Sequence, residues 1–234
     1  MSFLCIDCGN TRLKWGLRNG TKWIGQGALA LSELAGLAVP AERIVACNVA
    51  GDKARHGVEA LATRLVVPLR WLRAQAAGGG VTNGYEHPEQ LGVDRWAALI
   101  GARALHAGPA IVVMSGTATT VDRLDADGVF QGGLILPGLA MMREALAGGT
   151  ADLPVAAGEF RPLPRNTFDA IASGCLNATL GAIERMFRQV ADRPDALCLL
   201  AGGAAPTLAA HLVLPHRVVE SLVLEGLASV ATAP

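Results

Sequence analysis

The first thirty residues alternate short apolar runs with turn residues, which is typical of β-strands joined by tight connections. The run at 3–8 (FLCIDC) ends at an acid, Gly9–Thr11 interrupts it, and a second apolar run follows at 13–17. Asn19–Gly20 then supplies two positions that tolerate positive φ, which favours a type I′ hairpin turn. The apolar residues of 21–31 complete the pattern, so the N-terminal segment predicts three consecutive strands.

A helical period replaces the strand pattern further along the chain. Residues 31–38 and 51–66 predict helices, and the apolar run at 42–49 between them predicts a buried parallel strand. The clearest helix of this half is 93–106, because its apolar positions recur at helical spacing. Gly108–Pro109 ends that helix, and we expect the boundary between two halves of the chain there.

The same order of elements returns from Ala110. Strand-like runs at 110–114, 121–124 and 129–136 are joined by a turn of small polar residues at 115–120 and by a second turn at Asp127–Gly128. The remaining predicted elements are a helix at 137–150, a long amphipathic helix at 168–193, a strand running into a Gly-Gly turn at 196–205, a strand at 216–220 and a helix at 221–231.

This repeated plan of three strands followed by alternating helices and strands predicts an α/β protein. We expect two ribonuclease-H-like lobes of the actin-like ATPase kind, each a mixed sheet with flanking helices. Residues 1–108 would form the N-terminal lobe and residues 109–234 the C-terminal lobe, facing each other across a cleft.

Composition narrows the class of partner. Apolar residues make up 51% of the chain and charged residues 17%, which excludes a disordered protein. Twenty basic residues balance twenty acidic ones, so no global field attracts nucleic acid or an anionic membrane. The longest charge-free stretch, 196–215, is broken by Gly202–Gly203 and Pro206, which argues against a membrane span. We therefore expect a soluble, cytoplasmic protein whose partners are small molecules.

The five cysteines fit the same compartment. Most of them lie in apolar runs, as reduced cytosolic thiols do. Cys5 and Cys8 have the spacing of a redox or zinc pair, but no second pair or ordered histidine cluster accompanies them. Residues 1–15 also lack the pattern of a secretory signal. Structural thiols are therefore favoured over metal or redox chemistry.

Glycine turns at strand ends are the main candidates for chemistry, because glycine lets the backbone approach nucleotide phosphates closely. The turn from Asp7 to Thr11 adds a carboxylate that would hold Mg²⁺ through water, and Lys14 lies within reach of a phosphate oxygen. Gly116–Thr117 occupies the corresponding place in the second half. Gly202–Gly203 follows a buried strand, where open α/β sheets bind ligands, and is a candidate for adenosine. One such turn alone is usually structural, but recurrence at equivalent places favours a nucleotide site.

Asp94 and Arg95 lie in the first turn of the helix predicted at 93–106. The helix dipole keeps a carboxylate there ionised, and such an acid accepts a hydroxyl proton. Phosphoryl transfer needs little base strength, so a positioned carboxylate suffices, and Arg95 would neutralise an anionic oxygen. The structural alternative is an ordinary N-terminal acid beside a surface arginine.

A set of segments in order along nearly the whole chain resembles the type III pantothenate kinases, close to their Bvg accessory factor branch. These enzymes belong to the actin, sugar kinase and heat-shock ATPase superfamily. The segments are DCGNTRLK at 7–14, LGVDR at 91–95, GTATTVD at 116–122, GGLILPG at 132–138, LPRNTFDAIASG at 163–174 and AGG at 201–203. The combination is specific, whereas any one segment alone is weak.

The resemblance implies transfer of the ATP γ-phosphate to the terminal hydroxyl of pantothenate, the first step of coenzyme A synthesis, with Asp94 as the base. It implies a first phosphate loop of Asp7, Gly9, Asn10, Thr11 and Lys14, with Mg²⁺ at Asp7. Gly116 and Thr117 would contact ATP, with Gly202 and Gly203 at its adenosine. Pantothenate would be held by Tyr85, Gly92, Val93, Asp94 and Arg95, and by Thr167 from the partner subunit of a homodimer.

One position departs from the family pattern. The second phosphate motif of the family begins with an Asp that helps bind a monovalent cation such as potassium, and Met114 stands at that place here. Hard cations prefer oxygen ligands to a thioether, so we expect weak or absent dependence on K⁺ or NH₄⁺. Two alternatives stay open at this point: a phosphotransferase of the superfamily with another substrate, and a regulatory or ligand-binding member without kinase activity.

Overall fold

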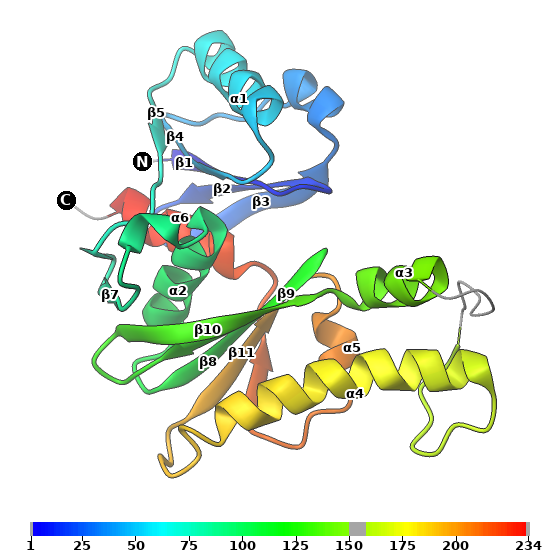
Figure 1. Cartoon of the computed structure of the whole chain (residues 1–234). Coiled ribbons are helices and arrows are strands. Elements are labelled where there is room, and N and C mark those ends of the chain that lie inside the picture. Colours follow the sequence, from blue (N-terminus) through cyan, green and yellow to red (C-terminus); the bar gives the residue numbers. More distant parts are fainter. Residues whose placement is uncertain (1, 150–157, 233–234) are drawn as a thin grey trace. The chain divides into compact units, whose positions relative to one another are not determined.

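The computed structural model describes residues 2–149 and 158–232, and these form two compact units (Figure 1). The first unit contains the chain up to Ala107, the short segment Gly128–Gln131 and the chain from Ser221 onward. The second contains Gly108–Asp127 and Gly132–Glu220. Each unit is a mixed α/β layer structure, in agreement with the predicted fold class.

The sheet of the first unit has the strand order β3-β2-β1-β4-β5. Its strands are β1 (Ser2–Cys8), β2 (Leu13–Asn19), β3 (Lys22–Leu29), β4 (Ile44–Asn48) and β5 (Leu69–Trp71). The first three strands pair antiparallel, and β4 pairs parallel to β1, as the pattern predicts. Gly20 has φ +56° in the β2–β3 turn, so the Asn-Gly dipeptide adopts the positive φ expected of it.

Helices cover both faces of this sheet. The 3₁₀ helix η1 (Leu31–Gly36) and α1 (Asp52–Leu65) pack against one face, where Leu4, Ile6 and Ile44 form part of a buried cluster. Residues that alternate with these, such as Cys5 and Asp7, point to the other face. Two helices, α2 (Val93–Leu105) and α6 (Leu222–Thr232), contact the strands there. In Figure 1, α1 and α6 accordingly lie on opposite sides of β1.

The C-terminal helix α6 packs tightly on α2 through two glycines. A Cβ atom added to Gly226 would lie 1.8 Å from the Ala97 carbonyl oxygen, and one added to Gly101 would lie 2.1 Å from the Leu222 carbonyl oxygen. Glu225 also fixes the helix, because its carboxylate accepts from Trp23 Nε1 at 2.7 Å and from Arg18 Nη1 at 3.1 Å. The division expected at residues 108 and 109 therefore does not hold for α6, since close helix packing joins it to the first unit.

A small ribbon completes the first unit. It consists of β6 (Ala77–Gly78) and β7 (Val81–Asn83), joined by two glycines with positive φ. The start of β10 (Val129–Pro137) pairs with it in parallel, with Phe130 opposite Asn83. These strands are two or three residues long, too short for an alternating pattern to reveal, and the sequence did not predict β6 and β7. The 3₁₀ helix η2 (Pro88–Gln90) follows.

The sheet of the second unit repeats the plan of the first. Its strands run in the order β12-β11-β8-β9-β10, with β8 (Ala110–Ser115) and β9 (Ala118–Leu124) antiparallel. β11 (Leu197–Ala201) pairs parallel with β8 and with β12 (His216–Val218). An antiparallel pair of strands followed by parallel strands agrees with the repeated plan of the sequence pattern.

Among the described residues, the helices of this unit are α3 (Leu139–Gly149), α4 (Thr167–Phe187) and α5 (Ala205–Ala209). α4 runs along the sheet in Figure 1, and its Leu176, Leu180 and Ile183 join the buried cluster of β8 and β11. It begins at Asn166, whose side chain accepts from the Asp169 N–H at 2.9 Å, and ends six residues before the predicted limit of 193, where turns begin. Residue 150, the predicted end of the helix at 137–150, lies outside the described residues.

No helix within the described ranges is both long and apolar enough to span a bilayer.

Candidate active site

Three side chains lie in a row across one face of the first sheet. Asp7 on β1 is directly opposite Lys14 on β2 and directly opposite Cys47 on β4. Register neighbours point to the same face, and adjacent strands are about 4.8 Å apart. Asp7 is 9% exposed and Cys47 is fully buried, while Lys14 is half-buried. The Cys47 thiol donates to Asp7 Oδ1 at 3.5 Å.

The environment of Asp7 disfavours its charged form. Burial is the main cause, and the nearby Asp94 carboxylate adds to it, so that the pKa of Asp7 rises to about 6. Lys14 and the thiol of Cys47 act in the opposite direction, but less strongly. Because Asp94 acts on this pKa, the β1 strand end and the start of α2 place two carboxylates close together. Asp7 and Asp94 are 87 positions apart in the sequence.

Asp94 is fixed by its own backbone turn. It is the second residue of α2, and its Oδ1 accepts from the Arg95 N–H at 2.9 Å. A Cβ added to Gly92 would lie 2.7 Å from that Oδ1, so the absence of a side chain at Gly92 leaves room for the Asp94 carboxylate. Val93 and Asp94 are half-buried, which leaves them accessible at the start of the helix.

Arg95 and Tyr85 form a stacked pair with a third residue, Phe130. The Arg95 Nη1 donates to Tyr85 Oη at 2.9 Å, and the guanidinium carbon lies 5.6 Å from the Tyr85 ring centroid and 5.7 Å from that of Phe130. The two rings are 5.1 Å apart. Arg95 is only 5% exposed, so the site contains a buried cation held against aromatic faces. Asn83 fixes the turn before Tyr85 by accepting from its N–H at 3.1 Å.

The loop after β1 borders a small cavity. The cavity has a volume of about 170 Å³, and loop residues and the first turn of α1 line it. Its lining residues are Cys8, Gly9, Asn10, Thr11, Arg12, Leu13, Leu31, Ala50, Lys53 and Ala54. Asn10 and Thr11 are exposed and Gly9 is half-buried, so the predicted phosphate loop is open to a ligand.

Two predicted glycine turns meet in the second unit. A Cβ added to Gly202, which has φ +98°, would lie 2.3 Å from the Ser115 carbonyl oxygen, so β11 ends against the turn that begins with Gly116. Gly116 and Thr117 are exposed, and the Thr117 carbonyl accepts from the Gly138 N–H at 2.9 Å. Gly203 is exposed as well. These two turns, predicted separately, therefore lie together.

Met114 and Thr167 occupy other parts of the second unit. Met114 is half-buried in β8, opposite Thr120 on β9 and Ala201 on β11. Thr167 is the first residue of α4 and is exposed, as is its neighbour Phe168. The contact of Thr167 with pantothenate bound to a partner subunit stays a prediction.

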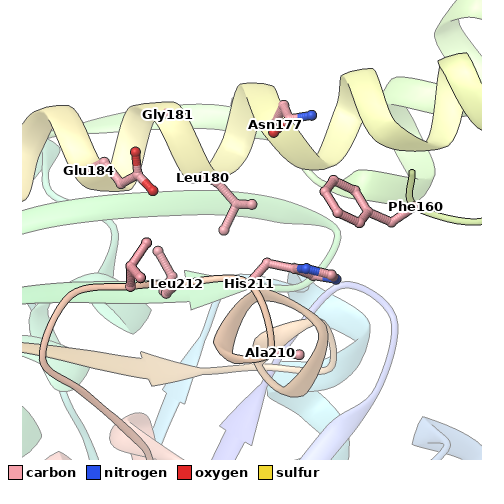
Figure 2. A pocket seen from close by; sticks show the side chains of 9 residues that line it. Phe160, Asn177, Leu180, Gly181, Glu184, Ala210, His211 and Leu212 are labelled. Atoms are coloured by element: carbon pink, nitrogen blue, oxygen red, sulfur yellow. The ribbon is translucent and has the colours of Figure 1, made fainter. Parts of the chain in front are cut away.

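A larger cavity of about 590 Å³ lies between α4 and the segment after α5 (Figure 2). Figure 2 shows Phe160 and His211 at one end of it and Glu184 near Leu212 at the other. The rings of Phe160 and His211 are 4.2 Å apart. None of the predicted site residues lines this cavity, so its size does not mark the candidate active site.

The donor atoms near Asp7 suit magnesium. Within residues 2–149 and 158–232, no group of three or more His, Cys, Asp and Glu side chains is arranged to hold a metal ion. Mg²⁺ keeps several waters and is often bound by one or two carboxylates together with substrate phosphates, all through oxygen. Asp7 provides such a carboxylate, and a cation beside it would offset the cost of burying its charge. Cys5 and Cys8 do not form a metal pair, because an odd offset in a strand directs them to opposite faces.

Sequence reasoning missed the two residues that support this site. Phe130 was only one apolar position of a predicted strand, and Cys47 only one thiol in an apolar run. No local signal distinguishes them, since their roles depend on strand register. The predicted parallel strand at 42–49 did contain the information for Cys47, once its pairing with β1 is known.

Known proteins share this chain's sequence over most of its length. The sequence model of the type III pantothenate kinase family matches residues 3–189. A type III pantothenate kinase of Aromatoleum aromaticum is 54% identical over 234 residues, covering 97% of each chain. One from an Azoarcus species is 51% identical over 238 residues, covering 98% of this chain and 90% of the relative.

Solved structures share the fold at lower identity. A Campylobacter jejuni protein provisionally assigned as a Baf family transcriptional activator superposes with a TM-score of 0.65 at 18% identity, covering 97% of this chain and 96% of that one. A Sinorhizobium meliloti protein provisionally assigned as a 2-dehydro-3-deoxygalactonokinase has a TM-score of 0.62 at 18% identity, covering 98% of each chain. The fold of two ribonuclease-H-like lobes is therefore the one predicted from the sequence.

Proposed function

Because the chain belongs to the type III pantothenate kinase family, we propose that it transfers the γ-phosphoryl group of ATP to the terminal hydroxyl of pantothenate. The product is 4′-phosphopantothenate, and the reaction is the first step of coenzyme A synthesis. The identity of 54% over 97% of both chains is the observation that carries this proposal. The five cysteines are buried and form no disulfide bonds within the described chain, as expected of a cytoplasmic enzyme.

Asp94 is the proposed base. Its Oδ1 is held by the Arg95 N–H at 2.9 Å, so the carboxylate has a fixed orientation before substrate binds. The proton of the pantothenate hydroxyl passes to an Asp94 oxygen as the hydroxyl oxygen attacks the γ-phosphorus and the bond to ADP breaks. The loose transition state of phosphoryl transfer makes a carboxylate strong enough for this step.

ATP and a divalent cation, which we take to be Mg²⁺, are the proposed cofactors. Asp7 would hold the cation through water, and Lys14 opposite it on β2 would contact phosphate together with Gly9, Asn10 and Thr11. The bound cation would neutralise charge on the transferring phosphoryl group. Gly116 and Thr117 are proposed phosphate contacts of the second unit, and Gly202 and Gly203, which adjoin that turn, are proposed for adenosine.

Pantothenate is the proposed ligand of the α2 start. Gly92 and Val93 give backbone approach, and the stacked Arg95 and Tyr85 provide a positive charge and an aromatic face near Asp94. A buried guanidinium suits the carboxylate of pantothenate, because paired opposite charges offset the cost of burial. The neutral overall charge of the chain fits a small anionic substrate better than a nucleic acid.

We further propose a homodimer in which Thr167 contacts pantothenate bound to the other subunit. Apolar side chains around this part of the second unit are exposed, as expected of a face that a second copy covers. They include Leu163 at 86% and Phe168 at 48% exposure, both within four residues of Thr167. Mixing inactive Asp94→Asn and Thr167→Ala subunits should restore roughly a quarter of the sites, because one site of each mixed dimer is intact.

The proposed function is tested by ATP consumption with pantothenate and with several sugars as acceptors. We expect turnover with pantothenate alone, and its loss in Asp94→Asn by about a hundredfold or more with ATP binding intact. Tight ATP binding without turnover of any acceptor would instead favour a regulatory protein. Turnover of a sugar would favour another phosphotransferase.

A further inference from the structure

Cys47 contacts the Asp7 carboxylate and is even less exposed than Asp7 itself. It occupies β4, the strand that pairs parallel with β1, and the register sets it level with Asp7. Lys14 occupies the equivalent place on the other side, on β2. Asp7 is thus held between an ammonium group that attracts it and a thiol that contacts it.

The Cys47 thiol is a hydrogen-bond donor in this place. Its sulfur is 3.5 Å from Asp7 Oδ1, within the normal range for a sulfur donor, and the residue is fully buried. A thiol has a proton to donate and a carboxylate oxygen accepts, so the contact is a bond donated from the Cys47 thiol to the Asp7 carboxylate.

This bond has a consequence for the geometry of the carboxylate. An aspartate side chain rotates about two torsions, and its terminal torsion is broad. A donor fixed by the sheet at Oδ1 removes much of that freedom and leaves Oδ2 to bind water or a cation. Preorganised carboxylates bind metal more tightly, because the supporting partners of a metal ligand set its orientation.

We propose that Cys47 is a positioning residue, whose thiol holds Oδ1 of Asp7 so that the carboxylate is oriented for the divalent cation that accompanies ATP. This role rests on the proposed function, in which Asp7 holds that cation. It differs from a packing role, because any side chain of similar volume would serve packing, whereas positioning needs a donor.

The test compares Cys47→Ala, which removes the donor, with Cys47→Ser, which keeps one. The free Mg²⁺ concentration for half-maximal activity is measured at saturating ATP and pantothenate, and the KM for pantothenate is measured separately. Cys47→Ala should raise the Mg²⁺ requirement about threefold to tenfold, the effect of one lost hydrogen bond, and leave the KM for pantothenate unchanged. Cys47→Ser should restore the wild-type requirement.

Cys198→Ala is the matched control. Cys198 is also fully buried in a parallel strand and belongs to the apolar cluster of the second unit, but the strand register places it opposite Ile111 and His216 rather than opposite a carboxylate. It should lower thermal stability as much as Cys47→Ala does without changing the Mg²⁺ requirement. An unchanged requirement in Cys47→Ala, an equal change in Cys198→Ala, or a failure of serine to rescue would each overturn the proposal.

A calorimetric measurement separates this proposal from the proposed function. Mg²⁺-dependent ATP binding is compared for the wild type, Cys47→Ala and Cys47→Ser without pantothenate. If the wild type does not phosphorylate pantothenate, the proposed function fails, but weaker Mg²⁺-dependent binding in Cys47→Ala with rescue by serine still supports the positioning role. Identical binding in all three proteins refutes it.

Discussion

The contact between α2 and α6 makes a sharp prediction about stability, because it has no room for a side chain at Gly226. An alanine there would place its Cβ 1.8 Å from the Ala97 carbonyl oxygen and 3.0 Å from the Gly101 nitrogen. Carbon and carbonyl oxygen approach no closer than about 3.3 Å even in favourable contacts, so α6 has to retreat by roughly 1.5 Å. The retreat pulls buried residues such as Leu222 and Leu227 away from their neighbours.

The magnitude follows from two opposing effects. Overpacking of this kind costs about 1–3 kcal/mol, and here backbone rather than a flexible side chain is the obstacle, so we take the upper end. Alanine returns about 1 kcal/mol through its helix propensity. Gly226→Ala should therefore lower the free energy of unfolding by about 2 kcal/mol. For a chain of this length that corresponds to a fall in Tm of about 4–8 °C.

A second glycine provides the control. Gly181 lies in the interior of α4, and a Cβ added to it meets nothing within 4 Å. Gly181→Ala should raise Tm by about 2–3 °C, because only the helix propensity changes. Differential scanning calorimetry of the wild type and both variants measures the effects. A Tm for Gly226→Ala equal to or above that of the wild type would refute the close packing of α6 on α2.

Three further predictions concern single positions. Val66 follows the last residue of α1, has φ 56° and is 89% exposed. Val66→Gly should therefore raise the free energy of unfolding measured by urea titration by about 1 kcal/mol, because glycine adopts positive φ without strain. Val213 is 95% exposed but has a negative φ, so Val213→Gly should give no such gain. In metal-free protein at pH 7.5, Asp7→Asn should raise the free energy of unfolding by up to about 3 kcal/mol, because folding raises the pKa of Asp7 from 3.8 to about 6. That gain should vanish as the pH falls from 6 to 4, where the folded wild type binds the proton, and a gain independent of pH would contradict the assignment. Potassium or ammonium at constant ionic strength should stimulate activity little, given Met114, and Met114→Asp should introduce stimulation, while strong saturable stimulation of the wild type would show that a cation site exists without that carboxylate.

The longer strands of both sheets were predictable because each carries a local pattern, whereas the short strands β5, β6 and β7 were not predicted. The Asn-Gly turn at 19–20, the strand at 42–49 and the helix at 93–106 follow from alternation, turn chemistry and helical period, and all three are present. What failed needs information that is not local. α6 is recognisable as a helix, but its assignment to the first unit depends on a packing partner more than 120 residues earlier in the chain. The glycines inside the two predicted helices, Gly101 and Gly226, are the local sign of that close packing.

The residues of the candidate site also divide into those that the sequence identified and those whose roles depend on the fold. Asp7, Lys14, Asp94 and Arg95 were identified because charged residues next to glycine turns stand out in a largely apolar sequence. The proximity of Asp7 and Asp94 came from the fold alone, as did the stacking of Phe130 on Arg95. An apolar residue or a thiol that supports a charged one looks like any other core residue until the strand register is known.

Register is also what makes this site dependent on the core beneath it. Leu4 and Ile6 on β1 and Ile44 and Ala46 on β4 point into the cluster under α1, which forces the intervening Asp7 and Cys47 to the other face. A slip of one residue between β1 and β4 would turn apolar side chains out of that cluster and move Cys47 away from Asp7. Such a slip would cost several buried contacts, so the apolar pattern that fixes the sheet also fixes the row of Lys14, Asp7 and Cys47. Substitutions in this cluster that preserve volume should therefore preserve the proposed Mg²⁺ requirement, even though none of these residues would contact the cation.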